Sequence, residues 1–383
     1  MRKILFILFI GSLLLNSCST GEKALQQGNY YEAIMKSAGR LSSDPDNSKA
    51  IQVVRDGYPM ALTYYQEQID RVLSSNDLFK WKQAYDIMLT VNRMSDEVRR
   101  IPAARKLVST TKTYTSEMAD VQSKAAQEMY NAGLDALSRK TREDAKQAFF
   151  HFQTAEDLMR GFKDAKQKML ESKNLATLKV VVEQIPVNGK YEYSAQFFYD
   201  NVFQMLNEKF QEKDFVHFYS TEEAEKTKLK YPDMVLRMGF YDFFIDRPSH
   251  FEEEKEIAKE VEEKYQVKDA NGNPVTKTRM VPRRGKIKIV TDQMASGGLL
   301  ELKAVEFQSQ KIVFTDKIPG QFTWENKYGL FVGDKEVLDK DLERIVNNKV
   351  LTAPPSQDMF VLFTKPIFNQ LSGKLISYFR QYN

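Results

Sequence analysis

The sequence predicts an α+β protein in which a helical-hairpin array is followed by a mixed α/β sheet domain. Between residues 21 and 172, apolar residues recur at intervals of three and four, as they do on amphipathic helices. From residue 175 onward, short β-branched and aromatic runs alternate with helical segments, which is typical of a sheet with helices laid across it. We therefore expect a signal peptide over 1–17, a helical domain over 18–174 and an α/β domain over 175–383.

The composition argues against two classes of partner. Lysine and arginine together exceed aspartate and glutamate by four, and Arg2 and Lys3 in the signal peptide account for two of those charges. So small a surplus does not favour nucleic-acid binding. After Leu15 no run approaches the roughly 20 apolar residues that a membrane-spanning helix needs. We therefore expect no nucleic-acid partner and no further membrane segment.

The N-terminus carries the most specific motif. Arg2 and Lys3 precede an apolar run that ends at Leu15, and Asn16-Ser17-Cys18 follows. A basic start, a short apolar core and a small residue before the cut form a secretory signal. The ending resembles the lipobox of bacterial lipoproteins, which implies acylation of Cys18 as the first mature residue. Cys18 is the only cysteine, so it has no disulfide partner within the chain; an ordinary signal peptide with an incidental cysteine is the alternative.

Residues 24–45 contain a helical-repeat signature. Gly28 suits a tight turn between helices, Tyr30 and Ala33 suit positions where helices approach closely, and Pro45 suits the end of the second helix. This pattern resembles the second part of a tetratricopeptide repeat. It implies a partner-binding array.

Further helices are expected over 58–73, 78–94 and 118–137, and a second repeat candidate over 130–165. We predict about three stacked hairpins, with a plain helical bundle as the alternative.

In the second half, we expect strands over 178–185, 215–219, 234–245, 286–291, 298–307 and 311–316, and helices over 195–210, from 221, over 338–347 and over 357–382. The last helix has a continuous apolar stripe and is expected to close the core. Gly297-Gly298 is interpreted as a turn. The order of elements resembles the periplasmic α/β domain of the family that includes the curli secretion lipoprotein and, more distantly, the amino-terminal domain of TolB.

Residues 252–284 are predicted to form a charged hairpin arm around Asn271-Gly272. In the curli protein such a domain contributes β-hairpins to a membrane pore, but the charges of this arm do not alternate with apolar residues as they do on a lipid-facing strand. We expect the arm to be solvated or to hold a charged partner. Arg283, Arg284 and Trp324 are candidate partner contacts, although Trp324 also suits the end of a sheet.

No pattern here indicates catalysis. The sequence lacks a phosphate loop, a zinc motif and a nucleophile elbow. His151 is expected to pack within a helix, and His217 and His250 are expected to be structural or exposed. We predict no catalytic residue, no metal site and no cofactor.

These observations together predict a non-enzymatic outer-membrane lipoprotein that faces the periplasm and acts as a scaffold in envelope assembly or secretion machinery. Its expected partners are other envelope proteins, and its only membrane contact is the lipid on Cys18. In style the sequence resembles lipoproteins of the Bacteroidetes. Residues 19–23 lack the acidic cluster that marks surface export in that group. An oligomeric pore of the curli type and a glycan-processing enzyme with a paired-carboxylate cleft are the alternatives.

Overall fold

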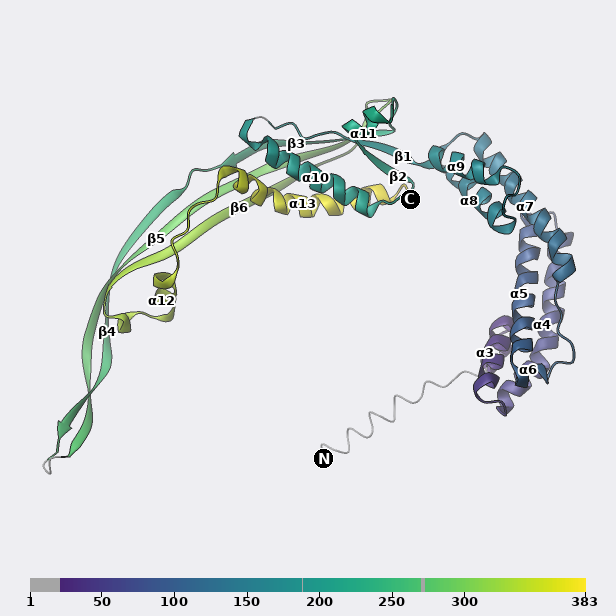
Figure 1. Cartoon of the computed structure of the whole chain (residues 1–383), viewed down its shortest axis with the longest axis horizontal. Coiled ribbons are helices and arrows are strands. Elements are labelled where there is room, and N and C mark those ends of the chain that lie inside the picture. The colour runs from purple at the N-terminus through teal and green to yellow at the C-terminus, as the bar shows by residue number, and fades with distance from the viewer. Residues whose placement is uncertain (1–20, 188, 270–272) are drawn as a thin grey trace. The chain divides into compact units, whose positions relative to one another are not determined.

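The computed structural model describes residues 21–187, 189–269 and 273–383 and confirms the α+β class: a helical region precedes a mixed six-stranded sheet (Figure 1). The chain divides into two compact units at Ala176–Thr177. The sequence-based boundary lies two residues earlier, between 174 and 175. Cys18 and the signal peptide lie outside the described residues. The two units are described separately below.

The first unit is a succession of helices that pack on their neighbours in sequence and, in places, on the next helix but one, as α3 does on α5. Its helices are α2 (Glu22–Gln26), α3 (Tyr30–Ser43), α4 (Ser48–Ser74), α5 (Lys80–Arg100), α6 (Pro102–Arg105), α7 (Thr115–Ser138), α8 (Arg142–Leu158) and α9 (Ala165–Ala176). Buried apolar side chains form successive clusters over helices α3 to α6, over α4 to α7 and over α7 to α9. Each helix therefore buries its apolar face against helices that are close to it in the sequence.

The turn between α2 and α3 contains the residues of the repeat signature. Gly28 has φ +72°, a left-handed conformation that costs glycine little, and its N–H donates to the Leu25 carbonyl. Ala33 is fully buried, whereas Tyr30 is half-buried with its ring 5.1 Å from that of Tyr64 on α4. Pro45 is exposed and directly follows the residue that caps the end of α3.

The second unit is built on one mixed sheet. Its elements are β1 (Leu178–Val182), α10 (Glu192–Lys209), β2 (Val216–Ser220), α11 (Thr221–Lys226), β3 (Met234–Ile245), β4 (Ser249–Lys268), β5 (Pro274–Glu306), β6 (Ile312–Gly333), a 3-10 turn η3 (Lys335–Val337), α12 (Lys340–Asn347) and α13 (Ser356–Arg380). The strand order is β2-β1-β3-β5-β4, and β6 pairs with β5. Along one edge, β5 pairs with β4 over its first part, residues 274–293, and with β3 over residues 296–306. β6 pairs with the other edge of β5.

The core of this unit lies between one face of the sheet and helices α10 and α13. Even-numbered strand residues such as Val180, Leu236 and Leu300 point into it, because side chains alternate between the two faces of a strand. Along α13, the predicted apolar stripe is completely buried: Phe360, Phe363, Ile367, Leu371, Leu375 and Phe379. This helix closes the core as the sequence predicts.

The interpretation of Gly297-Gly298 as a turn is wrong. Both glycines lie inside β5, which is one 33-residue strand where separate short segments were expected. Gly298 pairs with Gly320 on β6, and α13 passes directly over both: a Cβ on Gly320 would lie 2.5 Å from the Phe363 carbonyl oxygen. The two glycines therefore allow α13 to pack closely on the sheet at this point. The general preference of glycine for turns gives no sign of this role.

Helices α12 and α13 cover opposite faces of the sheet. A Cβ on Gly329 would meet Ile345 and Val346 of α12, whereas a Cβ on Gly320 would meet α13. The β5–β6 register is unbroken between these glycines, and an odd and an even residue of one strand face opposite sides. Residues 348–355 therefore cross the outer edge of β6, where the Asn348 amide donates to the Lys327 carbonyl (2.8 Å).

We expect Gly320→Ala to lower the free energy of unfolding of the α/β unit by about 1–3 kcal/mol, because the added methyl group forces α13 away from the sheet. Urea denaturation followed by Trp324 fluorescence in a Trp81→Phe background measures this unit, since the chain has two tryptophans. The control is Gly373→Ala on α13, whose Cβ would meet no atom of the described chain within 4 Å. An equal loss of unfolding free energy in the two variants would contradict the close packing of α13 on Gly320.

Candidate functional site

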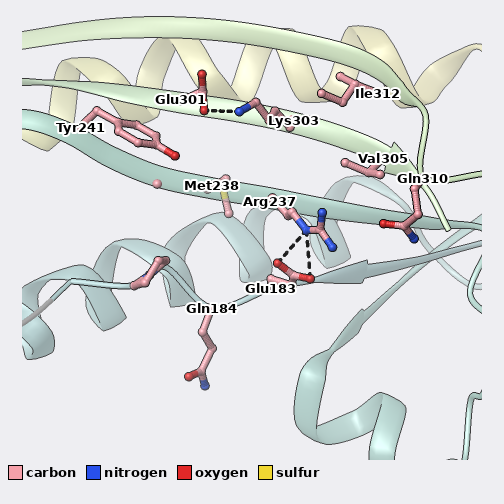
Figure 2. A pocket seen from close by; sticks show the side chains of 12 residues that line it. Glu183, Gln184, Arg237, Met238, Tyr241, Glu301, Lys303, Val305, Gln310 and Ile312 are labelled. Carbon is pink, nitrogen blue, oxygen red and sulfur yellow. Dashed lines mark hydrogen bonds and ion pairs between the residues drawn. The ribbon is translucent and has the colours of Figure 1, made fainter.

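The face of the sheet opposite α10 and α13 is open over β3, β5 and the start of β6. It contains a hollow of about 440 Å³. The polar residues around it come from β3, from β5, from the segment after β1 and from the β5–β6 turn, and they include Glu183, Arg237, Tyr241, Glu301 and Lys303. Figure 2 shows the Arg237 guanidinium directed at the Glu183 carboxylate and the Lys303 ammonium directed at Glu301.

Charge pairing governs the chemistry of this hollow. The Arg237 Nε lies 3.1 Å from the Glu183 carboxylate, and the Lys303 Nζ lies 2.5 Å from Glu301. The bond from Lys303 holds the pKa of Glu301 below its usual range. Glu301 is therefore an ionised acceptor at neutral pH and not a proton donor. The hollow is suited to polar contacts with a ligand or a protein surface.

A second exposed surface lies on the even-numbered face of the sheet, beyond the end of α13. Here β4 presents Glu254 and Glu256, the neighbouring β5 presents Lys286 and Lys288, and β6 presents Tyr328, Leu330 and Val332. Leu330 and Val332 are 57% and 78% exposed. The surface therefore consists of an acidic, a basic and an apolar stripe side by side, and the Lys286–Glu256 pair (2.6 Å) links the first two.

The predicted charged arm corresponds to the β4–β5 hairpin. β6 ends its pairing with β5 at Gly285, so residues 260–268 and 274–282 pair only with each other. We call this two-stranded segment the ribbon; it lies at one end of the α/β unit (Figure 1). None of its residues is buried. Arg279 donates to Glu263 (2.6 Å) across it.

The candidate contact residues occupy different settings. Arg283 is held within the chain, by Glu263 at 3.0 Å and by Asp334 at 3.2 Å, so it fastens the root of the ribbon to the end of β6. Arg284 is exposed on the striped surface. Trp324 is half-buried and lies opposite Met294 on β5. The repeat residues Gly28, Tyr30, Ala33 and Pro45 belong to the other unit.

The β4–β5 register brings together a charged cluster that sequence reasoning missed. His250 lies opposite Asp292, and its Nδ1 is 2.6 Å from the carboxylate, while its Nε2 is 3.1 Å from Glu252. Lys288 in turn contacts Glu252 (2.6 Å). The bond to Asp292 raises the pKa of His250 above its ordinary value. His250 and Asp292 are 42 residues apart in the sequence. The only sequence signal for their proximity was the strand-like alternation of the two segments that contain them.

The other two histidines, His151 and His217, are not part of this charged cluster. His151 packs with its ring 5.4 Å from that of Phe79, and burial lowers its pKa. His217 is exposed on β2. In the part of the chain that the structure describes, no group of three or more histidine, cysteine, aspartate or glutamate side chains is arranged to hold a metal ion. Over the same residues, no helix has the length and apolar character needed to span a bilayer.

No protein-family model matches the chain, and no curated protein is significantly similar to it. Among solved structures, it shows a likeness to a crystal structure described as a putative neuraminyllactose-binding hemagglutinin homolog from Helicobacter pylori. The two are 16% identical, and the match covers 54% of this chain and 92% of that one with a TM-score of 0.24. A TM-score this low supports no conclusion about fold or function.

The charged cluster predicts the pH behaviour of His250. Its raised pKa means that the pairing with Asp292 stabilises the folded state fully below the ordinary pKa of 6.5, and that this contribution is lost as the pH rises through the folded-state pKa. NMR titration should place the pKa of His250 above 6.5 and that of His151 below it. Asp292→Asn should lower the pKa of His250 and leave that of His151 unchanged; an unchanged His250 pKa would contradict the pairing.

Proposed function

We propose that this protein is a lipid-anchored envelope protein of the outer membrane that faces the periplasm and acts as a protein-binding scaffold within assembly or secretion machinery. The signal sequence and the lipobox-like ending at Cys18 support the anchor. The main support for the scaffold role is the exposed ribbon. The chain holds a long strand pair away from its core, and that pair has both faces and both edges available.

The ribbon is an unusual element for a protein without a partner. A two-stranded hairpin alone is marginally stable in water, and unpaired strand edges template association with other chains. Here β5 extends from the buried sheet into the ribbon, and the Arg279–Glu263 pair ties the two strands together. The ribbon is therefore held in an extended form that a partner can contact without first ordering it.

The helical unit supports the same function. Helices that stack on nearby helices of the sequence leave a long surface exposed, and arrays of this kind bind protein segments. The first turn, at Gly28, and the buried Ala33 place α2 and α3 close together at the start of this array.

The pore alternative fits the side chains of the ribbon less well. A lipid-facing strand presents apolar residues at every second position. On the even-numbered face of β4 the ribbon instead presents Glu260, Glu262, Lys264 and Lys268. On the odd-numbered face Glu263 interrupts Val261, Tyr265 and Val267, and β5 places Lys277 and Arg279 opposite Tyr265 and Glu263. Neither face of β4 offers an apolar band.

The anchor predicts where a Cys18 variant is found. In cells of a lipoprotein-processing bacterium, the native chain should fractionate with the outer membrane, and Cys18→Ser should move to the soluble periplasmic fraction. Mass spectrometry of the native N-terminal peptide should show an acylated cysteine at residue 18. A native chain that lacks the acyl group, or that stays with the membrane after Cys18→Ser, contradicts the anchor.

The scaffold predicts a defined set of co-purifying proteins. We expect affinity purification from gently solubilised membranes to recover a reproducible group of envelope proteins, and expect replacement of residues 262–280 by an Asn-Gly turn to lose part of that group, since the ribbon contacts it. Glu222→Gln, an exposed change on α11, serves as the control and should lose none. Recovery of the protein alone as a detergent-stable ring would support the pore in place of the scaffold.

A further inference from the structure

We infer that the outer edge of β4 binds an extended segment of a partner protein in which lysine or arginine occurs at every second position. The segment adds to the sheet as a strand beside β4. This inference rests on the proposed scaffold function and specifies the chemistry of one partner. Three features of β4 support it: the orientation of its backbone groups, the side chains beside them and the strand already paired with its inner edge.

The backbone of β4 is unpaired along its outer edge. β4 is the last strand of the sheet on its side, and its 20 residues pair with β5 alone. The Asp269 N–H donates to the Asn273 carbonyl (2.9 Å) where the hairpin closes. Bonded and unbonded pairs alternate along antiparallel strands, and the β4–β5 register has no shift. Odd-numbered residues of β4 therefore bond to β5, and even-numbered residues direct their N–H and C=O groups outward.

The same even-numbered residues place acidic side chains on one face of the strand. Over residues 252–262 they are Glu252, Glu254, Glu256, Glu260 and Glu262, interrupted only by Ala258. Lys264 and Lys268 follow on the same face, so the acidic part of the edge is 252–262. Glu252 and Glu256 contact lysines of β5, whereas Glu260 and Glu262 make no ion pair with any residue that the structure describes. A strand added at this edge would place every second side chain about 5 Å from these glutamates, measured between Cβ atoms.

The strand on the inner edge shows which chemistry β4 accepts. Lys286 lies directly opposite Glu256, and Lys288 directly opposite Glu254, so β5 supplies alternate basic residues on this face. The Nζ atoms lie 2.6 Å from Glu256 and from Glu252, respectively. A partner with the same alternation would repeat on the outer edge the pairing that β5 makes on the inner edge.

The opposite face of β4 restricts the partner to alternate basic residues. There Glu253 is paired with Lys255 (2.8 Å) and Glu263 with Arg279 and Arg283. Between these glutamates, Lys255 and Lys259 flank the half-buried Ile257, and Val261 follows. A run of consecutive lysines would place half of its charges beside Lys255 and Lys259, where like charges repel. Apolar or neutral residues at these positions instead meet Ile257 and Val261. The edge thus selects for the spacing of basic residues as well as for their number.

The test compares two peptides of about nine residues with the same composition. One alternates lysine with threonine and valine, and its isomer groups the lysines together. We expect fluorescence anisotropy with the detergent-solubilised full chain to show about tenfold tighter binding of the alternating peptide, and this binding should weaken as salt is added. Equal affinities for the two isomers would overturn the inference, because simple charge attraction would explain them.

Three variants separate edge pairing from net charge. Glu260→Lys should weaken binding of the alternating peptide about tenfold, whereas Glu253→Lys, with the same charge change on the other face, should weaken it far less. Ala258→Pro removes an outward N–H and leaves the net charge unchanged, so it should abolish binding while amide exchange shows that β4 and β5 stay paired. Equal effects of the two lysine variants, or unchanged binding by Ala258→Pro, would overturn edge pairing.

Sedimentation of the free chain and its variants tests the two competing roles of this edge. A chain that associates with its own copies through β4 would make a second copy the occupant and overturn the inference. So would association of Glu260→Lys without any peptide binding, because the glutamates would then only protect the edge. If no peptide binds but membrane partners still depend on residues 262–280, the inference fails while the scaffold function stands.

Discussion

The α/β unit depends on the continuity of β5. This one strand of 33 residues hydrogen-bonds to β3, β4 and β6, so it belongs to the core, to the striped surface and to the ribbon. Strand pairing requires an extended backbone on both partners, and a break in β5 would separate the ribbon from the buried sheet. The burial of α13 against the C-terminal half of β5 and the N-terminal half of β6 therefore also fixes the strands that lie beyond the helix.

The same arrangement explains why the candidate contact surfaces are charged. Helices α10 and α13 cover one face of the sheet, and α12 covers the other face only near the end of β6. The uncovered areas must remain soluble, and they do so through cross-strand ion pairs such as Arg237–Glu183 and Lys286–Glu256. Exposed pairs of this kind contribute little stability. They do give each uncovered area a defined pattern of charge, which a partner can recognise.

Local patterns in the sequence predicted much of the fold. β3 spans the expected residues 234–245, and α13 buries the expected apolar stripe, since alternation and helical periodicity are local signals. The sequence did not predict the length of β5 or the role of Gly298, because each depends on which helix passes over the strand. The His250–Asp292 pair was missed for a related reason: it requires the register of two distant strands.

The extension of β5 from the core into the ribbon also has a mechanical consequence. A pull on the ribbon along its strands loads the hydrogen bonds that join β5 to β3 and β6 in shear, so that many bonds bear the force at once. A hairpin attached by a loop would instead open bond by bond from its base. Because β5 stays paired with β6 from Gly285 to Val305, tension applied to the ribbon is transmitted directly to the sheet beneath α13.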